Sequence, residues 1–241
     1  MTTSGNWKLS ACALLAAALL AAGTPAQAGD DPHDPYEGFN RAMFAVNEGL
    51  DKVVVKPLAV VYDEAIPLPA KSGVGNFFDN IADVRNALNN TLQGKLSEAG
   101  SDLGRLLINT TVGIFGLFDV ASELGLERHE EDFGQTLAVW GAGDGGFLYW
   151  PLVGPKTVRD TFGMVGDIYS DPTWGTINKS VATRNSMVGL RFVETRASLL
   201  PTDKVVDEAA LDKYAYIRDA YLQRRRSLIF DGRPPREDDD Y

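Results

Sequence analysis

Apolar residues recur at helical spacing in three separate stretches, and this periodicity constrains the possible fold more than any other feature of the sequence. The first stretch steps by four and three residues through Phe39, Met43, Val46, Leu50 and Val53. The second contains Phe77, Ile81, Val84, Leu88 and Leu92, and the third contains Val206, Ala210, Tyr214, Ile217 and Tyr221 and continues to Leu228. Strand-like alternation is scarce, and residues 136–140 are the one short candidate. We therefore predict an all-α fold.

Proline and glycine positions divide the chain. Pro57, Pro67 and Pro69 interrupt the first helical region, and residues 232–235 (Gly-Arg-Pro-Pro) end the last helix. The length of 241 residues, of which 44% are hydrophobic, suits one domain over residues 29–232. Residues 233–241 are rich in proline and aspartate and are predicted to form a disordered acidic tail.

The N-terminus predicts a signal peptide over residues 1–28. Lys8 precedes an apolar run from residue 11 to residue 22, and an A-x-A cleavage signature follows at residues 26–28. This run would span about 18 Å as a helix, short of the roughly 30 Å hydrocarbon core of a bilayer. Two alternatives are a retained membrane anchor and a lipobox ending at Cys12. Because Cys12 precedes most of the apolar run, we favour Sec-type export without lipidation at Cys12.

Composition argues against several functional classes. The 33 acidic and 23 basic residues give a net charge of −10, which disfavours nucleic acid as a partner. A single cysteine and two histidines leave little material for disulfides, metal sites or histidine-based catalysis. We therefore expect no enzyme activity, no cofactor and no metal site.

Three motifs resemble functional sites, and each has a simpler interpretation. Residues 141–146 (GAGDGG) fit G-x-G-x-x-G, but an aromatic run ending in Pro151 follows instead of a helix, which favours a flexible loop or hairpin. Residues 129–132 (HEED) are typical of a solvated loop or helix start. Residues 224–226 (RRR) suit the end of a helix, with contact to anionic headgroups or an acidic partner as the alternative.

Two glycine-laced aromatic segments, residues 109–121 and 140–155, have two open interpretations. Aromatic and small residues suit a membrane interface, where tryptophan and tyrosine settle at headgroup level. They also suit an aromatic core with tight turns. Pattern alone does not separate the two.

Several segments, in order, resemble the MlaA (VacJ) family of outer-membrane phospholipid-transport proteins. The first is DPYEGFNRAMFAVNEGLD, residues 34–51. The others are VVKPLAVVY (54–62), NFFDN (76–80), RLLINTTVGIFGLFDVA (105–121), DFGQTLAVWGAGDGGFLYWPLVGP (132–155), VRDTFG (158–163), ETRASLL (194–200) and YAYIRDAYLQRR (214–225). The family is usually lipidated on a cysteine after the apolar signal, and this sequence has none there.

The resemblance implies a ring of amphipathic helices lying in the membrane plane around a central amphipathic channel. It implies non-enzymatic removal of mislocalised phospholipid from the outer leaflet and transfer to a periplasmic lipid carrier, in association with a trimeric porin at the periplasmic side of the outer membrane. The resemblance also assigns a channel hairpin to Gly141, Gly143, Gly145, Gly146, Phe147, Tyr149 and Trp150. We expect Phe39, Met43, Val46, Phe115 and Phe118 to face the membrane.

Two other functional hypotheses remain at this point. One is a periplasmic scaffold or porin adaptor without its own lipid channel. The other is a lipid hydrolase, which needs a nucleophile and base, or a metal, that the sequence does not offer convincingly.

Overall fold

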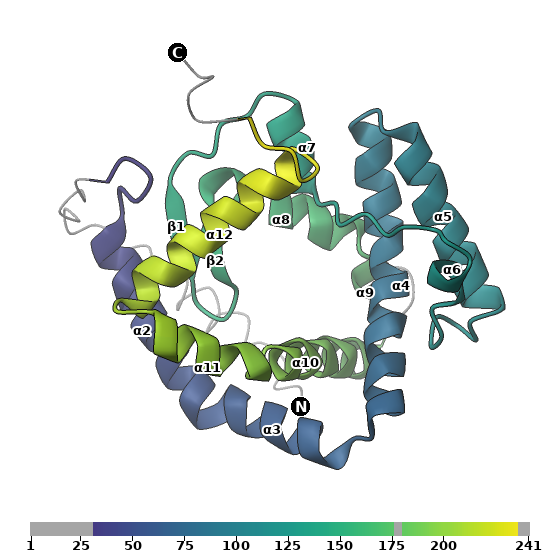
Figure 1. The fold of residues 1–241 in the computed structure, drawn as a ribbon, viewed down its shortest axis with the longest axis horizontal. Helices are drawn as coiled ribbons and strands as arrows, with labels where there is room; N and C mark the ends of the chain where they lie inside the picture. Colours follow the sequence, from purple (N-terminus) through teal and green to yellow (C-terminus); the bar gives the residue numbers. More distant parts are fainter. Residues whose placement is uncertain (1–30, 176–179, 236–241) are drawn as a thin grey trace, which may run out of the picture.

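The computed structural model describes residues 31–175 and 180–235, so the predicted signal peptide, Cys12 and most of the predicted tail lie outside the described residues. Helices follow one another around a ring, with a short hairpin on one side (Figure 1). The first half contains α2 (Glu37–Leu50), a π-helical turn (Asp51–Val55), α3 (Lys56–Ala65), α4 (Leu68–Leu92), α5 (Leu96–Thr111), α6 (Val120–Glu123) and α7 (Phe133–Val139). The second half contains β1 (Phe147–Trp150), β2 (Gly154–Thr157), α8 (Val158–Ser170), α9 (Pro172–Gly175), α10 (Val181–Ser198), α11 (Leu200–Ala209) and α12 (Lys213–Ile229). The predicted helical class and ring are confirmed.

The prolines lie at helix starts, where a missing N–H matters little. Pro57 lies at the beginning of α3 and Pro69 at the beginning of α4. Because α2 continues through the π-helical turn into α3, the first predicted apolar stripe follows one bent rod rather than a helix that Pro57 ends.

The predicted strand at residues 136–140 is wrong. Residues 133–139 form α7, because Asp132 caps the helix by accepting a hydrogen bond from the backbone N–H of Gln135 at 2.9 Å. The strand lies further along, where β1 pairs antiparallel with β2 and Phe147 is opposite Thr157. Phe147 and Tyr149 face inward from this hairpin.

The third apolar stripe also differs from the prediction, because it crosses two helices. α11 ends before Ala210, whose backbone is extended, and Asp212 then caps α12 by accepting a hydrogen bond from the N–H of Ala215. Side-chain periodicity continues across this break, so the apolar pattern alone does not reveal it.

The buried face of α4 contains more polar side chains than is usual for a helix in a water-soluble protein. Its buried face is mostly polar and consists of Asn80, Asp83, Asn86, Asn89 and Asn90, together with Phe78, Ile81, Ala82 and Ala87. Leu88 and Leu92, at the end of the predicted apolar stripe, are exposed instead. Water-soluble proteins keep most asparagine and aspartate side chains outside, so this helix indicates an apolar environment around the ring.

The apolar core is small and lies between the hairpin and its neighbouring helices. Phe147, Tyr149 and Tyr214 form its buried centre, and Met43, Phe44, Ile217, Tyr221 and Leu222 pack around it. Phe44 contacts the Tyr149 ring edge-to-face, with the ring centroids 5.4 Å apart. None of the helices in the described residues combines the length and apolarity that crossing a bilayer requires.

Candidate functional site

A buried arginine organises the α4–α5 hairpin. The Arg105 guanidinium donates to both carboxylate oxygens of Asp119 at 3.0 Å and to the Leu126 carbonyl at 2.7 Å. Its Nε lies 3.5 Å from an oxygen of Asp83, which is fully buried. Although burial alone would raise it, hydrogen bonds from Ser122, Arg105 and Asn109 lower the pKa of Asp119 to about 2. Burial outweighs the nearby arginines at Asp83 and raises its pKa to about 6.

The clasp formed by Arg105, Asn109 and Asp119 holds an exposed apolar loop. Residues 112–118 (VGIFGLF) join α5 to the short helix α6, and Phe115 and Phe118 are 72% and 59% exposed. Ile114 and Phe115 both adopt positive φ angles, 51° and 57°, which non-glycine residues rarely do. Asn109 accepts a hydrogen bond from the Ala121 N–H at 2.9 Å, just beyond the loop. Buried polar contacts at the base of the loop therefore hold its apolar side chains in an exposed position.

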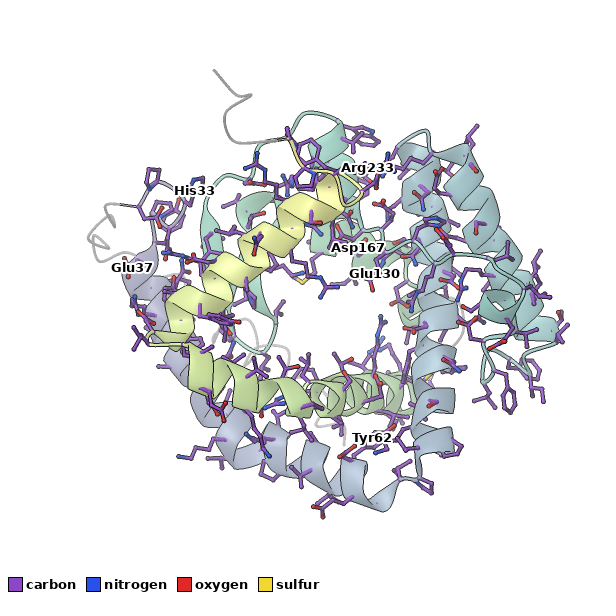
Figure 2. The ribbon with its side chains drawn as sticks, viewed as in Figure 1. His33, Glu37, Tyr62, Glu130, Asp167 and Arg233 are labelled. Atoms are coloured by element: carbon purple, nitrogen blue, oxygen red, sulfur yellow. The ribbon has the colours of Figure 1, made fainter. Side chains whose placement is uncertain are left out.

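A second arginine joins three helices near the C-terminus. Arg225 of α12 donates to both oxygens of Asp132 at 2.5 and 2.6 Å and to Asp160 of α8 at 2.8 Å. Burial opposes ionisation of Asp132, but the bonds from Arg225 prevail and lower its pKa to about 2. The predicted solvated Arg-Arg-Arg run is thus wrong for Arg225, which is buried, while Arg224 is exposed and pairs with Glu130. Asp167 accepts a hydrogen bond from the Phe133 N–H nearby, at 2.9 Å (Figure 2).

Two asparagines of α2 hold the hairpin in place. Asn40 donates to the Phe147 carbonyl at 3.0 Å and accepts from the Tyr149 N–H at 2.8 Å. Asn47 makes the matching pair of bonds to the Trp150 carbonyl at 2.9 Å and the Leu152 N–H at 2.8 Å. Their spacing of seven residues, two helical turns, places both amides on one face, and this spacing was a sequence signal that we missed.

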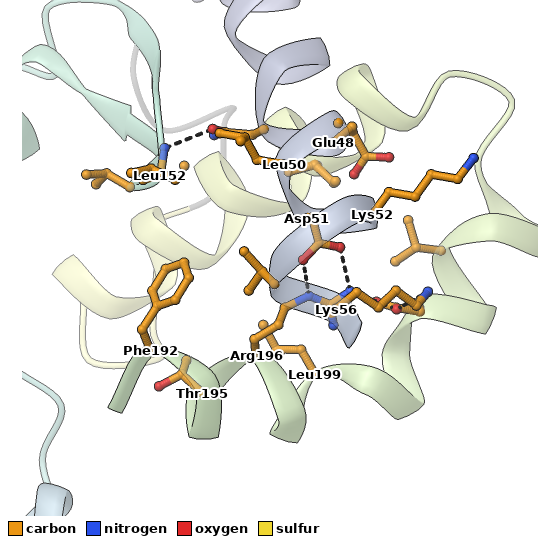
Figure 3. A pocket seen from close by; sticks show the side chains of 18 of the residues that line it. Glu48, Leu50, Asp51, Lys52, Lys56, Leu152, Phe192, Thr195, Arg196 and Leu199 are labelled. Atoms are coloured by element: carbon orange, nitrogen blue, oxygen red, sulfur yellow. Dashed lines mark hydrogen bonds and ion pairs between the residues drawn. The ribbon is translucent and has the colours of Figure 1, made fainter. Parts of the chain in front are cut away.

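A cavity of about 1180 Å³ lies between α2, the π-helical turn, the hairpin, α10, α11 and α12 (Figure 3). Its apolar wall includes Val55, Val188, Phe192, Leu199, Val206 and Ile217. Its charged lining residues include Glu48, Asp51, Lys56, Arg196, Asp203 and Lys213. The volume exceeds the roughly 300–1,000 Å³ usual for pockets that hold small molecules.

The charges in this wall form two separate groups of ion pairs, one around Arg196 and one around Lys213. Arg196 makes a two-point contact with Asp51, with distances of 2.7 Å from Nε and 2.9 Å from Nη2 to the two carboxylate oxygens. The same Nη2 lies 2.9 Å from Asp203 Oδ2, and Lys56 Nζ lies 2.7 Å from that oxygen. Lys213 pairs with Glu48 at 2.9 Å. The cavity therefore has an apolar surface beside charged side chains. A ligand with a charged group can replace one member of an ion pair and bind the other.

The predicted channel-hairpin residues have different locations. Among the residues lining the cavity, Tyr149 is present but Gly141, Gly143, Gly145 and Gly146 are not. The four glycines belong to the loop before β1 rather than to the hairpin. Gly145 and Gly146 have φ angles of +77° and +114°, and a Cβ on either would come within 2.9 Å of a neighbouring side chain. Phe147 is in the core, and the Trp150 indole donates to Thr161 at 2.9 Å.

The predicted membrane-facing residues divide into two groups. Phe115, Phe118 and Val46 are exposed. Phe39 and Met43 are half-buried, and Met43 packs against the aromatic core.

Both histidines make contacts within the fold. His129 Nδ1 lies 3.0 Å from Asp102, and the His33 carbonyl accepts a hydrogen bond from the Phe147 N–H at 3.0 Å (Figure 2). Within residues 31–175 and 180–235, no three His, Cys, Asp or Glu side chains gather as metal ligands would. The loop containing Gly141–Gly146 leads into β1, so no helix opens there to meet a pyrophosphate.

Comparison with known proteins gives one consistent result. A family model described as MlaA lipoprotein matches residues 32–228. The chain is 35% identical over 222 residues to the intermembrane phospholipid transport system lipoprotein MlaA of Escherichia coli (strain K12), with 90% of this chain and 86% of that protein covered. It is 29% identical over 206 residues to the Haemophilus influenzae protein of the same name, with 83% and 81% covered.

A solved structure has the same architecture. The structure, reported under "Structural basis for maintenance of bacterial outer membrane lipid asymmetry", matches with a TM-score of 0.71 at 33% identity and covers 83% of this chain and 99% of that one. The chain belongs to the MlaA lipoprotein family.

Proposed function

We propose that this protein works in intermembrane phospholipid transport, removing mislocalised phospholipid from the outer leaflet of the outer membrane and so maintaining lipid asymmetry. The names of its relatives in Escherichia coli and Haemophilus influenzae support this assignment. In this proposal the protein moves phospholipid without catalysing a chemical reaction.

The observation that carries the proposal is the cavity between α2, the hairpin, α10, α11 and α12. A phospholipid has apolar chains and a charged headgroup, and moving that headgroup through hydrocarbon without partners costs several kcal/mol. The cavity places Val188, Phe192 and Leu199 beside the ion pairs of Arg196 and Lys56. Such a wall accommodates both parts of the lipid at once.

We place the ring in the periplasmic side of the outer membrane, with its exposed apolar residues against acyl chains. The apolar loop at residues 112–118 and the exposed side chain of Val46 support this placement. Burying a large apolar side chain contributes roughly 1.5–3 kcal/mol, so several such residues together hold the ring in the leaflet. Phe39 and Met43 contribute less because they are half-buried.

The partners in this proposal follow from the family resemblance. A trimeric porin adjoins the ring within the membrane, and a soluble periplasmic carrier receives the lipid.

A cavity-filling substitution tests the transport role. Thr195 lines the cavity from α10, and Thr195→Trp adds an indole to that wall. Ser198→Trp, on an exposed position of the same helix outside the lining, is the matched control. In a strain lacking the native gene, Thr195→Trp at wild-type abundance should let phospholipid accumulate in the outer leaflet, while Ser198→Trp should not.

The same experiment decides against the adaptor hypothesis or for it. A periplasmic scaffold or porin adaptor without its own lipid channel would tolerate a filled cavity. Full restoration of the outer-membrane barrier by Thr195→Trp would therefore favour the adaptor and refute lipid passage through this cavity.

A further inference from the structure

Two cations in the cavity wall share one carboxylate oxygen. Lys56 Nζ lies 2.7 Å, and Arg196 Nη2 2.9 Å, from Oδ2 of Asp203. One cation comes from the start of α3 and the other from the end of α10, so separate elements build the site. Two cations around a single anionic oxygen are an arrangement that also binds phosphate oxygens.

Arg196 keeps its position independently of Asp203. Its two-point contact with Asp51 of the π-helical turn uses Nε and Nη2. Its remaining nitrogen, Nη1, is buried and has no hydrogen-bond partner among the residues that the structure describes. An unpaired buried donor is unfavourable, so the guanidinium has spare capacity for a ligand with several oxygens.

Asp203 lies on α11, a helix with few packing contacts. α11 has no buried residue, and it packs against its sequence neighbours α10 and α12. Its ion pairs include those of Asp203 with Arg196 and Lys56 and a 3.4 Å pair between Asp207 and Lys213. The two cations counteract burial and lower the pKa of Asp203, which keeps the carboxylate charged. A carboxylate on a loosely packed helix can leave its site at little packing cost.

We propose that Asp203 occupies, as an internal substitute, the binding site for the phosphodiester of a phospholipid, and that Lys56 and Arg196 receive that phosphodiester when α11 moves away. This inference rests on the proposed transport function and adds a headgroup site to it. Phe192 and Leu199 line the same cavity (Figure 3), and in this proposal they contact the acyl chains. Competition between Asp203 and the lipid couples lipid entry to release of α11.

Binding of soluble probes tests the assignment. The probes are dihexanoylphosphatidylcholine, dihexanoylglycerol, which lacks the phosphate, and inorganic phosphate, which lacks the chains. The full mature protein is held in amphipol, and dissociation constants are measured by titration calorimetry. Lys56→Gln should weaken phosphatidylcholine binding roughly tenfold, as loss of one partly solvated charge-assisted hydrogen bond implies, and leave dihexanoylglycerol binding unchanged.

Asp203→Asn should have the opposite effect. Removing the competing anion should tighten phosphatidylcholine binding roughly three- to tenfold, and a misfolded variant cannot produce tighter binding. Lys71→Gln and Asp63→Asn are matched controls, because Lys71 and Asp63 form a 2.5 Å pair between α3 and α4 that is not part of the cavity lining. Both controls should bind phosphatidylcholine like the wild type.

The outcomes separate this inference from the transport proposal. If the wild type binds neither lipid, the transport proposal fails and the headgroup site fails with it. If the wild type binds both lipids but Asp203→Asn does not tighten binding, or Lys56→Gln weakens both lipids equally, only the headgroup site is overturned. Inorganic phosphate binding as tightly as phosphatidylcholine, with the same response to Lys56→Gln, would identify a free-phosphate site and overturn the lipid assignment.

Discussion

Replacing Arg105 with methionine should destabilise the protein by about 3–5 kcal/mol, the usual loss when one partner of a buried ion pair is removed. Methionine retains the apolar stem of the side chain but none of its donors. The change leaves Asp83, fully buried and 3.5 Å from Arg105, with less compensation. It also removes the two 3.0 Å bonds to Asp119, which is 31% exposed and can be rehydrated. Asp83 therefore dominates the loss.

The loss of stability caused by Arg105→Met should depend on pH, because the Asp83 carboxyl titrates near pH 6 in the folded protein. Burial raises its pKa from the ordinary 3.8 to about 6, so between these values the folded protein binds more protons than the unfolded chain. The stability contribution of Asp83 is complete below pH 3.8 and falls as pH rises through 6, by roughly 3 kcal/mol in total. Without Arg105 the pKa rises further, so the destabilisation should be larger at pH 8 than at pH 5. Asp119, with a pKa of about 2, is ionised at both and adds no such difference.

Urea unfolding in mild detergent at pH 5 and pH 8 measures both quantities. Adding Asp83→Asn to Arg105→Met should recover more than half of the loss at pH 8, because the uncompensated charge is gone. Arg224→Met is the control: Arg224 and its partner Glu130 are both exposed, so its loss should stay below about 1 kcal/mol. A loss below 1 kcal/mol for Arg105→Met, or an equal loss at both pH values, would refute the reasoning.

Three further predictions concern the membrane, the glycine loop and the N-terminus. Phe115→Ser combined with Phe118→Ser should reduce vesicle association at least tenfold, since each exposed ring contributes roughly 1.5–3 kcal/mol when buried in lipid; unchanged co-sedimentation with vesicles would contradict the membrane-facing assignment. Gly145→Pro should fail to fold because proline cannot adopt a φ of +77°, whereas Gly143→Pro should fold, and normal transport by Gly143→Pro would exclude a gating role for this loop. Intact-mass measurement of protein from native membranes should give an unmodified chain beginning at Gly29, and an acylated Cys12 at the N-terminus would contradict this.

Periodicity predicted helices better than it predicted their surroundings. The stripe from Phe39 to Val53 follows α2 and the π-helical turn, as expected. On α4 the spacing predicted the helix correctly, but within the predicted stripe Ile81 is buried while Leu88 and Leu92 are exposed. A period identifies which residues share a face, and it does not determine whether that face meets protein or lipid.

The cavity was not predictable in the same way, because its charged residues come from distant segments. Asp51, Arg196 and Asp203 each resemble an ordinary solvated charge in the sequence, and the fold brings Asp51 within 3 Å of Arg196 although 145 positions separate them. The apolar pattern also failed to predict where two helices begin, because a single capping residue sets each start. Asp132 made residues 133–139 a helix, and Asp212 began a new helix inside an apparently continuous stripe.

The buried, amide-rich face of α4 has a thermodynamic consequence. Exposing polar surface lowers the heat capacity of unfolding by about 0.26 cal/K/mol per Å², whereas exposing apolar surface raises it by about 0.45. Here unfolding exposes the buried side chains of Asn86, Asn89 and Asn90. Many large apolar side chains are already exposed on the surface of the folded ring, so unfolding adds less apolar surface. The heat-capacity change per residue should therefore be smaller than in a water-soluble domain of this length. A small heat-capacity change flattens the dependence of stability on temperature, so the ring should keep nearly constant stability from cold to warm growth conditions.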